Sequence, residues 1–98
     1  METITVKVRT ILSIKKILGK GEIQVNIPAG STLQDLLKEM VHTWGDKLAS
    51  ELFDKDRTKT LPYIRLIING RDIEFLNGTK TVLNDGDEVL ILPPDGGG

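Results

Sequence analysis

The sequence predicts an α+β fold in which a mixed sheet of four to five strands packs against one main helix. Four short segments, at residues 4–8, 23–27, 64–68 and 88–92, are rich in Ile, Val and Leu. Most of them alternate apolar and polar residues, which is the pattern of half-buried strands. One longer segment, residues 33–44, instead repeats its apolar residues at helical spacing.

The composition excludes several classes of protein. The 98 residues suit one compact domain. The 13 Lys and Arg nearly balance the 14 Asp and Glu, which argues against nucleic acid as the main ligand. The lack of cysteine excludes disulfides and thiolate chemistry. No signal peptide or membrane-spanning run is recognisable, so we expect a cytoplasmic protein that does not bind membranes.

The first two strands are expected to flank a short amphipathic turn. Residues 4–8 and 23–27 alternate strictly, and the apolar residues within 11–18 are spaced for a helical turn that Gly19 and Gly21 close. Two interpretations of residues 11–18 stay open. They fold back on the core, or they form a partly exposed patch for a partner.

The main helix has the clearest boundaries. Ser31 is the predicted N-cap, with Gln34 completing a capping box, and Gly45 stands at the C-terminal end. His42 lies off the apolar stripe, and as the only histidine it is read as a surface residue. The stripe itself consists of Leu33, Leu36, Leu37, Met40, Val41 and Trp44.

The second half of the chain completes the sheet. Residues 48–53 suggest a second short helix, and residues 64–68 form a strand that ends at the hairpin dipeptide Asn69-Gly70. Residues 72–75 are expected to return as a short strand. Because residues 88–92 are almost continuously apolar, we expect this last strand at the sheet centre, beside the first strand and covered on both faces.

We find no catalytic or metal-binding signature. Asp85 and Asp87 flank a glycine, but the other ligands of a calcium loop are missing, so this segment is interpreted as a turn. Gly19-Lys20-Gly21 does not connect a strand to a helix as a phosphate-binding loop does. The chain is therefore not expected to be an enzyme or to hold a metal.

The C-terminal tail is the candidate functional segment. We assign residues 1–92 to the domain and residues 93–98 to a flexible tail, mobile until a partner orders it. The prolines favour an extended segment, and glycines fit a channel too narrow for side chains. The Gly98 carboxylate would attack the α-phosphate of ATP and become an acyl-adenylate. The alternative is a frayed tail without a role. The tail residues predicted to lie in a partner's active-site channel are Pro93, Pro94, Gly96 and Gly97.

These features together resemble the small subunits of molybdopterin synthase, within the sulfur-carrier family that also contains the thiamine carriers. The resemblance covers nearly the whole chain and implies a ubiquitin-like β-grasp fold. It rests on residues 4–8, Ile17-Leu18-Gly19, Ser31-Thr32-Leu33, Ile68-Asn69-Gly70, residues 83–89, Leu92-Pro93-Pro94 and the terminal Gly97-Gly98.

The resemblance implies a route for the tail. An E1-like adenylyltransferase would use ATP and Mg²⁺ to adenylate Gly98, and sulfur from a persulfide enzyme would convert it to a thiocarboxylate. The tail would then enter the large subunit of molybdopterin synthase and donate sulfur to a pterin precursor of the molybdenum or tungsten cofactor. No cofactor would bind the chain directly. Two positions depart from the family pattern: Leu92 replaces a common aromatic, and Asp95 a common apolar residue.

Other functions stay open on this evidence. One alternative is a carrier for another sulfur pathway, for thiamine, cysteine or RNA thiolation, although the extra segment at residues 46–61 counts against the thiamine branch. A second class is a ubiquitin-like modifier that joins Gly98 to a lysine. A third is a passive binding domain with an inert tail.

A carrier must dock on its enzymes, so we expect an apolar surface near the point where the tail departs. The first candidates for this surface are Phe75 and Leu76, followed by Ile11 and Leu12.

Overall fold

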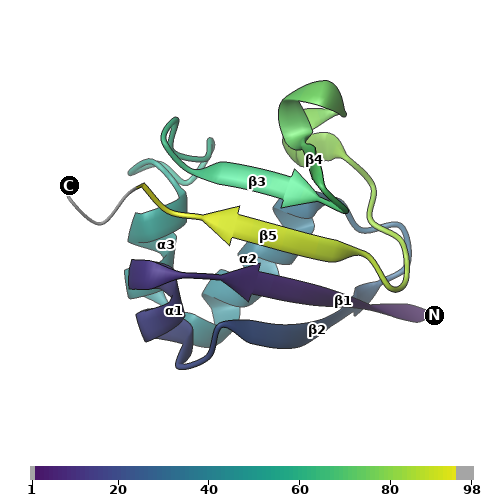
Figure 1. The fold of residues 1–98 in the computed structure, drawn as a ribbon, viewed down its shortest axis with the longest axis horizontal. Coiled ribbons are helices and arrows are strands. Elements are labelled where there is room, and N and C mark those ends of the chain that lie inside the picture. Colours follow the sequence, from purple (N-terminus) through teal and green to yellow (C-terminus); the bar gives the residue numbers. More distant parts are fainter. Residues whose placement is uncertain (1, 95–98) are drawn as a thin grey trace.

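The computed structural model describes residues 2–94, which form a five-stranded mixed sheet with helices on one face (Figure 1). The strands are β1 (Thr3–Thr10), β2 (Glu22–Pro28), β3 (Arg65–Ile68), β4 (Arg71–Asp72) and β5 (Glu88–Leu92). The helices are α1 (Leu12–Leu18), α2 (Leu33–Trp44) and α3 (Asp46–Leu52), with two short 3-10 helices, η1 (Ile73–Phe75) and η2 (Gly78–Lys80). The predicted α+β class is confirmed.

The sheet order β2-β1-β5-β3-β4 places the last long strand at the centre. β5 runs parallel to β1, with Val8 opposite Val89, and antiparallel to β3, with Leu66 opposite Ile91. β1 and β2 pair in antiparallel fashion on the other side. The prediction that the last strand lies beside the first is confirmed. Because β1 and β3 both pair with β5 through backbone hydrogen bonds, the position of the end of β5 is well defined.

The core lies between the sheet and α2, which sits behind the sheet in Figure 1. Leu33, Leu36, Leu37 and Met40 on α2 are fully buried, and Val41 and Trp44 pack against them while partly exposed. Each fully buried apolar side chain contributes roughly 1.5–3 kcal/mol before its loss of entropy is subtracted. The predicted helical stripe is therefore confirmed as the inner face of α2.

The N-cap of α2 differs from the prediction by one residue. Thr32, not Ser31, is the cap: its Oγ1 accepts a hydrogen bond from the Asp35 N–H at 3.2 Å, and the Thr32 N–H donates to Asp35 Oδ2 at 2.9 Å. Ser31 belongs to the preceding turn, where its N–H donates to the Pro28 carbonyl. An aspartate thus takes the place that the expected pattern gave to Gln34.

We expect Thr32→Ala to lower the free energy of unfolding by about 1 kcal/mol, since it removes one half of the capping box. Ser31→Ala is the matched control, because the hydrogen bonds of Ser31 come from its backbone: its N–H donates to the Pro28 carbonyl, and its carbonyl accepts from the Leu83 N–H. Urea unfolding of both variants measures the difference. Equal losses from the two substitutions would contradict the assignment of Thr32 as the cap.

The segment after β3 also differs in part from the prediction. The Asn69-Gly70 hairpin is confirmed, with φ of +51° and +85° as its tight turn requires. The expected strand at residues 72–75 is wrong beyond Asp72. The Asp72 carboxylate accepts a hydrogen bond from the Glu74 N–H at 2.9 Å and caps η1, so the chain turns away from the sheet.

The two short helices are confirmed. α1 ends at Gly19, whose φ of +81° is a left-handed C-cap, and it buries Ile14 and Leu18. α3 buries Leu48, Ala49 and Leu52 and leads into a polar loop. In that loop burial raises the pKa of Asp54, but hydrogen bonds from Thr58 and Lys59 outweigh this effect and leave the pKa below its usual value.

Candidate functional site

The chain leaves the domain at the end of β5, at one end of the sheet (Figure 1). The buried Thr10 hydroxyl donates a hydrogen bond to the Ile91 carbonyl at 2.7 Å and fixes this end to β1. Pro93 is buried and Pro94 is exposed. Pro93, which was predicted to belong to the tail, is therefore packed into the domain. The other predicted tail residues, including the expected mobile segment, lie outside the described residues, and they are Asp95, Gly96, Gly97 and Gly98.

β5 is not covered on both faces, so that prediction is wrong. Val89 and Ile91 are fully buried beneath the sheet, but Leu90 and Leu92 remain partly exposed on the opposite face. Among residues 2–94 no helix covers this open face (Figure 1). The continuous apolar run in β5 therefore supplies both a core surface and an exposed surface.

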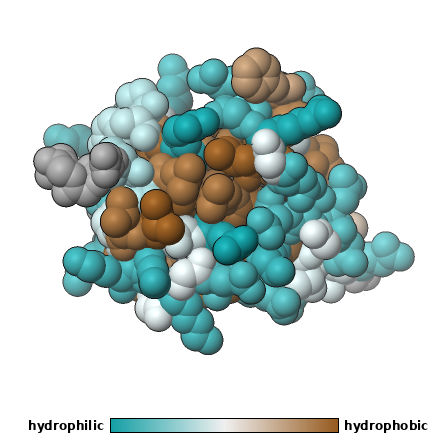
Figure 2. Space-filling view, in the orientation of Figure 1, coloured by the Kyte–Doolittle hydropathy of each residue, from teal (hydrophilic) through white to brown (hydrophobic). Residues whose placement is uncertain are grey.

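Five apolar residues gather on the open face near the exit of the chain, and we call them the exit patch: Ile11, Leu12, Ile67, Leu90 and Leu92. Ile67 lies opposite Leu90 in the sheet register. The pairing of Thr10 with Ile91 brings Ile11 beside Leu92. Figure 2 shows this apolar surface over β5 and β3, continuing toward the start of α1.

Residues 11–18 divide between the two interpretations that the sequence left open. Ile14 and Leu18 fold back on the core, as the first interpretation predicts. Ile11 and Leu12 are 45% and 43% exposed, as the second predicts. A helix of one and a half to two turns can bury only one side, so its first residues are left at the rim of the sheet.

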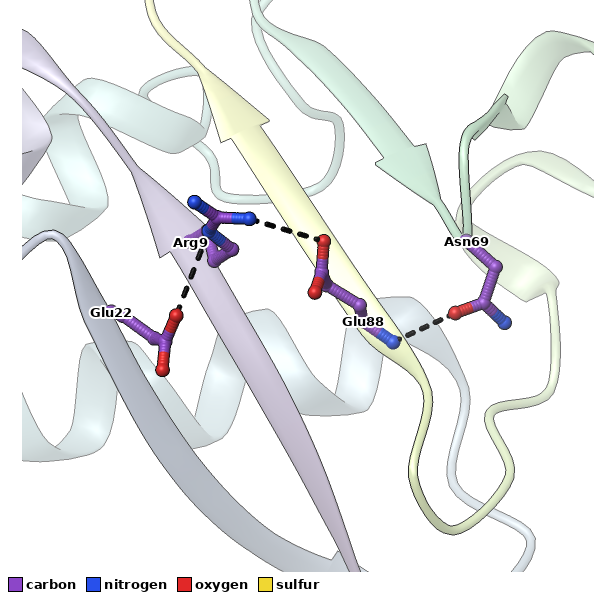
Figure 3. A network of polar contacts seen from close by, with 4 residues as sticks. All are labelled: Arg9, Glu22, Asn69 and Glu88. Carbon is purple, nitrogen blue, oxygen red and sulfur yellow. Dashed lines mark hydrogen bonds and ion pairs between the residues drawn. The ribbon is translucent and has the colours of Figure 1, made fainter.

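Charged pairs border the exit patch on the open face. Arg9 lies between Glu22 at 3.6 Å and Glu88 at 3.7 Å and so joins β2, β1 and β5 (Figure 3). The Glu88 N–H also donates to Asn69 Oδ1 at 2.9 Å. These ion pairs are half exposed and contribute only about 0–1 kcal/mol each. Their arrangement gives the apolar centre a polar rim, as at protein–protein interfaces.

A surface hollow of about 330 Å³ lies on the other side of the exit. Its lining residues are Ser50, Glu51, Leu61, Tyr63 and Pro94. Tyr63 is 56% exposed, and our sequence reasoning did not select it. The sequence does contain an indication of this residue. Tyr63 is an aromatic residue directly after Pro62, and aromatic residues are enriched at protein–protein interfaces.

Phe75 and Leu76 lie on the β4 side of β3, outside the exit patch. They follow β4, which pairs with Ile67 and Ile68, whereas the end of β5 lies opposite Arg65 at the other end of β3. Leu76 packs partly against the core. Phe75 is 82% exposed, so it is surface as expected, and it lines a hollow together with Pro62 and Arg65 rather than belonging to the exit patch.

We expect Phe75→Glu to change the free energy of unfolding by no more than about 0.5 kcal/mol, because an exposed side chain loses little contact on substitution. Thermal or urea unfolding of the variant measures this. A loss of several kcal/mol would show that Phe75 contributes to the core in solution.

Two other kinds of site are absent from residues 2–94. No helix in this range is long and apolar enough to cross a membrane. No group of three or more His, Asp or Glu side chains in the same range is arranged to hold a metal ion. His42 is exposed, as predicted.

Comparison with known proteins places these features in a family. The ThiS family model matches residues 13–98. "Small archaeal modifier protein 3" of Haloferax volcanii is 29% identical over 92 residues, covering 94% of this chain and 97% of that protein. A "putative sulfur carrier protein" of Archaeoglobus fulgidus is 31% identical over 86 residues, covering 78% of this chain and 98% of that protein.

Solved structures agree with these matches. Small archaeal modifier protein 1 from Methanosarcina acetivorans superimposes with a TM-score of 0.84 at 28% identity, covering 100% of both chains. A putative molybdopterin converting factor, subunit 1, from Pyrococcus furiosus gives 0.71 at 25% identity, covering 94% of this chain and 99% of that one. The expected ubiquitin-like β-grasp fold is confirmed, and the chain belongs to the ThiS family of ubiquitin-like sulfur carriers and modifiers.

Proposed function

We propose that this chain is a carrier whose C-terminal residue, Gly98, is adenylated and converted to a thiocarboxylate. The observation that carries the proposal is the fixed exit of β5 beside the exposed exit patch, in a chain whose family match extends to Gly98 itself. The fold then serves as a handle that docks on an enzyme and presents the terminal carboxylate to it.

The chemistry needs no side chain of the carrier. A Gly98 carboxylate oxygen attacks the α-phosphorus of ATP, pyrophosphate leaves, and an acyl-adenylate forms. Mg²⁺ bound by the E1-like adenylyltransferase would neutralise the phosphates. The terminal sulfur of a protein persulfide then attacks the acyl carbon, AMP leaves, and an acyl disulfide forms. A thiol attacks the protein-side sulfur of that disulfide, which breaks the S–S bond, releases the Gly98 thiocarboxylate and leaves an ordinary disulfide. The small, non-catalytic character of this family's members agrees with a carrier that is not itself an enzyme.

For the sulfur acceptor, we propose the pterin precursor of molybdopterin or tungstopterin, reached when the tail enters the large subunit of molybdopterin synthase. The likeness to the putative molybdopterin converting factor subunit of P. furiosus supports this acceptor. Leu92 belongs to the exit patch, so the residue that departs from the family's common aromatic is still an apolar contact beside the tail.

A second candidate is protein modification, in which Gly98 is joined to a lysine by an isopeptide bond. The relatives from H. volcanii and M. acetivorans that bear the name of archaeal modifiers favour it. Both candidates begin with the same adenylate, so the exit and its patch serve either one. Sulfur delivery to thiamine, cysteine or RNA is the remaining alternative within the same chemistry.

Mass spectrometry of the intact chain tests the proposal. The chain is incubated with extract of its source cells, ATP and a sulfur donor, and a parallel sample omits ATP. We expect an ATP-dependent exchange of one oxygen for sulfur, located at Gly98 by fragmentation. Covalent adducts with lysines of other proteins would favour the modifier. An unchanged mass together with an absence of adducts would contradict both candidates.

A further inference from the structure

Leu12 has an unusual backbone conformation. Its φ is +57°, in the left-handed region where the Cβ atom of an L-residue meets its own backbone. Only two other non-glycine residues in the described part of the chain share this sign, Arg57 and Asn69. Asn69 is the residue type that an Asn-Gly turn favours, and Arg57 lies in a polar loop. A leucine in this region is an outlier.

Burial of the Leu12 side chain does not compensate for this backbone strain. The side chain is 43% exposed, and α1 packs on the core through Ile14 and Leu18 instead. No side-chain hydrogen bond caps α1 at Ile11. A glycine or asparagine at position 12 would satisfy the backbone better, so the reason for a leucine there is to be sought outside the domain.

The position of Leu12 suggests what that reason is. It lies two residues after Thr10, which pairs with Ile91 just before the chain leaves β5. From Pro94 the remaining chain reaches roughly 17 Å when fully extended, at about 3.3–3.6 Å per residue. An enzyme that takes up Gly98 in its active site must therefore come close to the rim of the exit, where Leu12 is exposed.

We propose that Leu12 is a recognition residue for the enzyme that adenylates Gly98, held in a strained backbone conformation that keeps its side chain exposed at the exit. This inference rests on the proposed function. It explains why a bulky apolar side chain occupies a left-handed position without contributing to the core.

The test compares four variants in carrier-dependent ATP–pyrophosphate exchange, with the adenylating enzyme purified from the source cells by that same activity. Leu12→Gly and Leu12→Asn both accept a left-handed backbone and remove the apolar side chain. Leu12→Met keeps an apolar side chain of similar size. Arg57→Gly is the matched control, because it relieves a similar φ of +58° in the loop after α3, on a residue outside the exit patch.

We expect Leu12→Gly and Leu12→Asn to melt at or above the parental temperature. Their KM for the carrier should rise about tenfold or more while kcat stays unchanged, because docking is lost and the chemistry is not. Leu12→Met and Arg57→Gly should keep the parental KM. A KM within about twofold of the parental value for both Leu12→Gly and Leu12→Asn overturns the inference. So does a marked drop in their melting temperature. If the parental chain itself supports no exchange, it is the proposed function that fails.

Discussion

Deleting Gly97 and Gly98 is expected to abolish ATP–pyrophosphate exchange while leaving the melting temperature almost unchanged. The deletion withdraws the terminal carboxylate by roughly 7 Å, at about 3.3–3.6 Å per residue, from the atom it must attack. Along the sequence, the buried apolar residues of the described part of the chain begin at Val6 and end at Ile91. The deletion therefore removes none of them. The exchange assay with the adenylating enzyme and a thermal melt measure the two effects.

Extending the chain has a similar effect for a related reason. One alanine after Gly98 displaces the carboxylate by about 3.5 Å and adds a methyl group to a channel suited to glycine. An alanine added before Met1 is the matched control, since β1 runs parallel to β5 and begins at the opposite end of the sheet.

Parental exchange by the variant that lacks Gly97 and Gly98 would refute the carrier and the modifier together and favour an inert-tail binding domain.

Leu90→Glu is expected to raise the KM for the carrier by about 30-fold or more, with little change in stability. Leu90 lies opposite Ile67 on one side and Arg9 on the other, at the centre of the exit patch. A carboxylate there would be desolvated when the enzyme docks, and hot-spot substitutions of this kind cost about 2 kcal/mol or more. The partly exposed position and the nearby Arg9 guanidinium let the free domain tolerate the charge.

Phe75→Glu is the control for this experiment, because it places the same charge on an exposed apolar residue outside the exit patch. Initial rates at several carrier concentrations, together with urea unfolding, separate docking from folding. If Leu90→Glu keeps the parental KM, or if both substitutions raise it equally, the exit patch is not the docking surface.

Local patterns in the sequence were sufficient to predict most elements. Strict alternation at residues 4–8 and 23–27 predicted β1 and β2, because one face of each strand must be apolar to meet the core. The stripe at residues 33–44 predicted α2, and Asn69-Gly70 predicted its hairpin by the backbone conformation that these residues accept. The composition of the tail and its place after the last strand are the basis of the proposal that it is functional.

Competition between nearby residues decided what the patterns left undetermined. Ser31 and Thr32 are both good caps, and the choice of Thr32 depends on the turn at Pro28 that uses the backbone of Ser31. Residues 72–75 alternate charged and apolar side chains, a pattern that suits a strand. The Asp72 carboxylate instead binds the Glu74 N–H and turns the chain into η1.

By itself the sequence determined that β5 is apolar on both faces, that it lies at the centre of the sheet, and that a glycine tail follows it. Only the tertiary structure decided what covers the second face. Apolar side chains at Leu90, Leu92 and Ile67 satisfy a buried sheet and a docking surface equally well, since both exclude water. The difference arises because the helices pack on one face alone, which leaves these side chains exposed beside the exit of the chain.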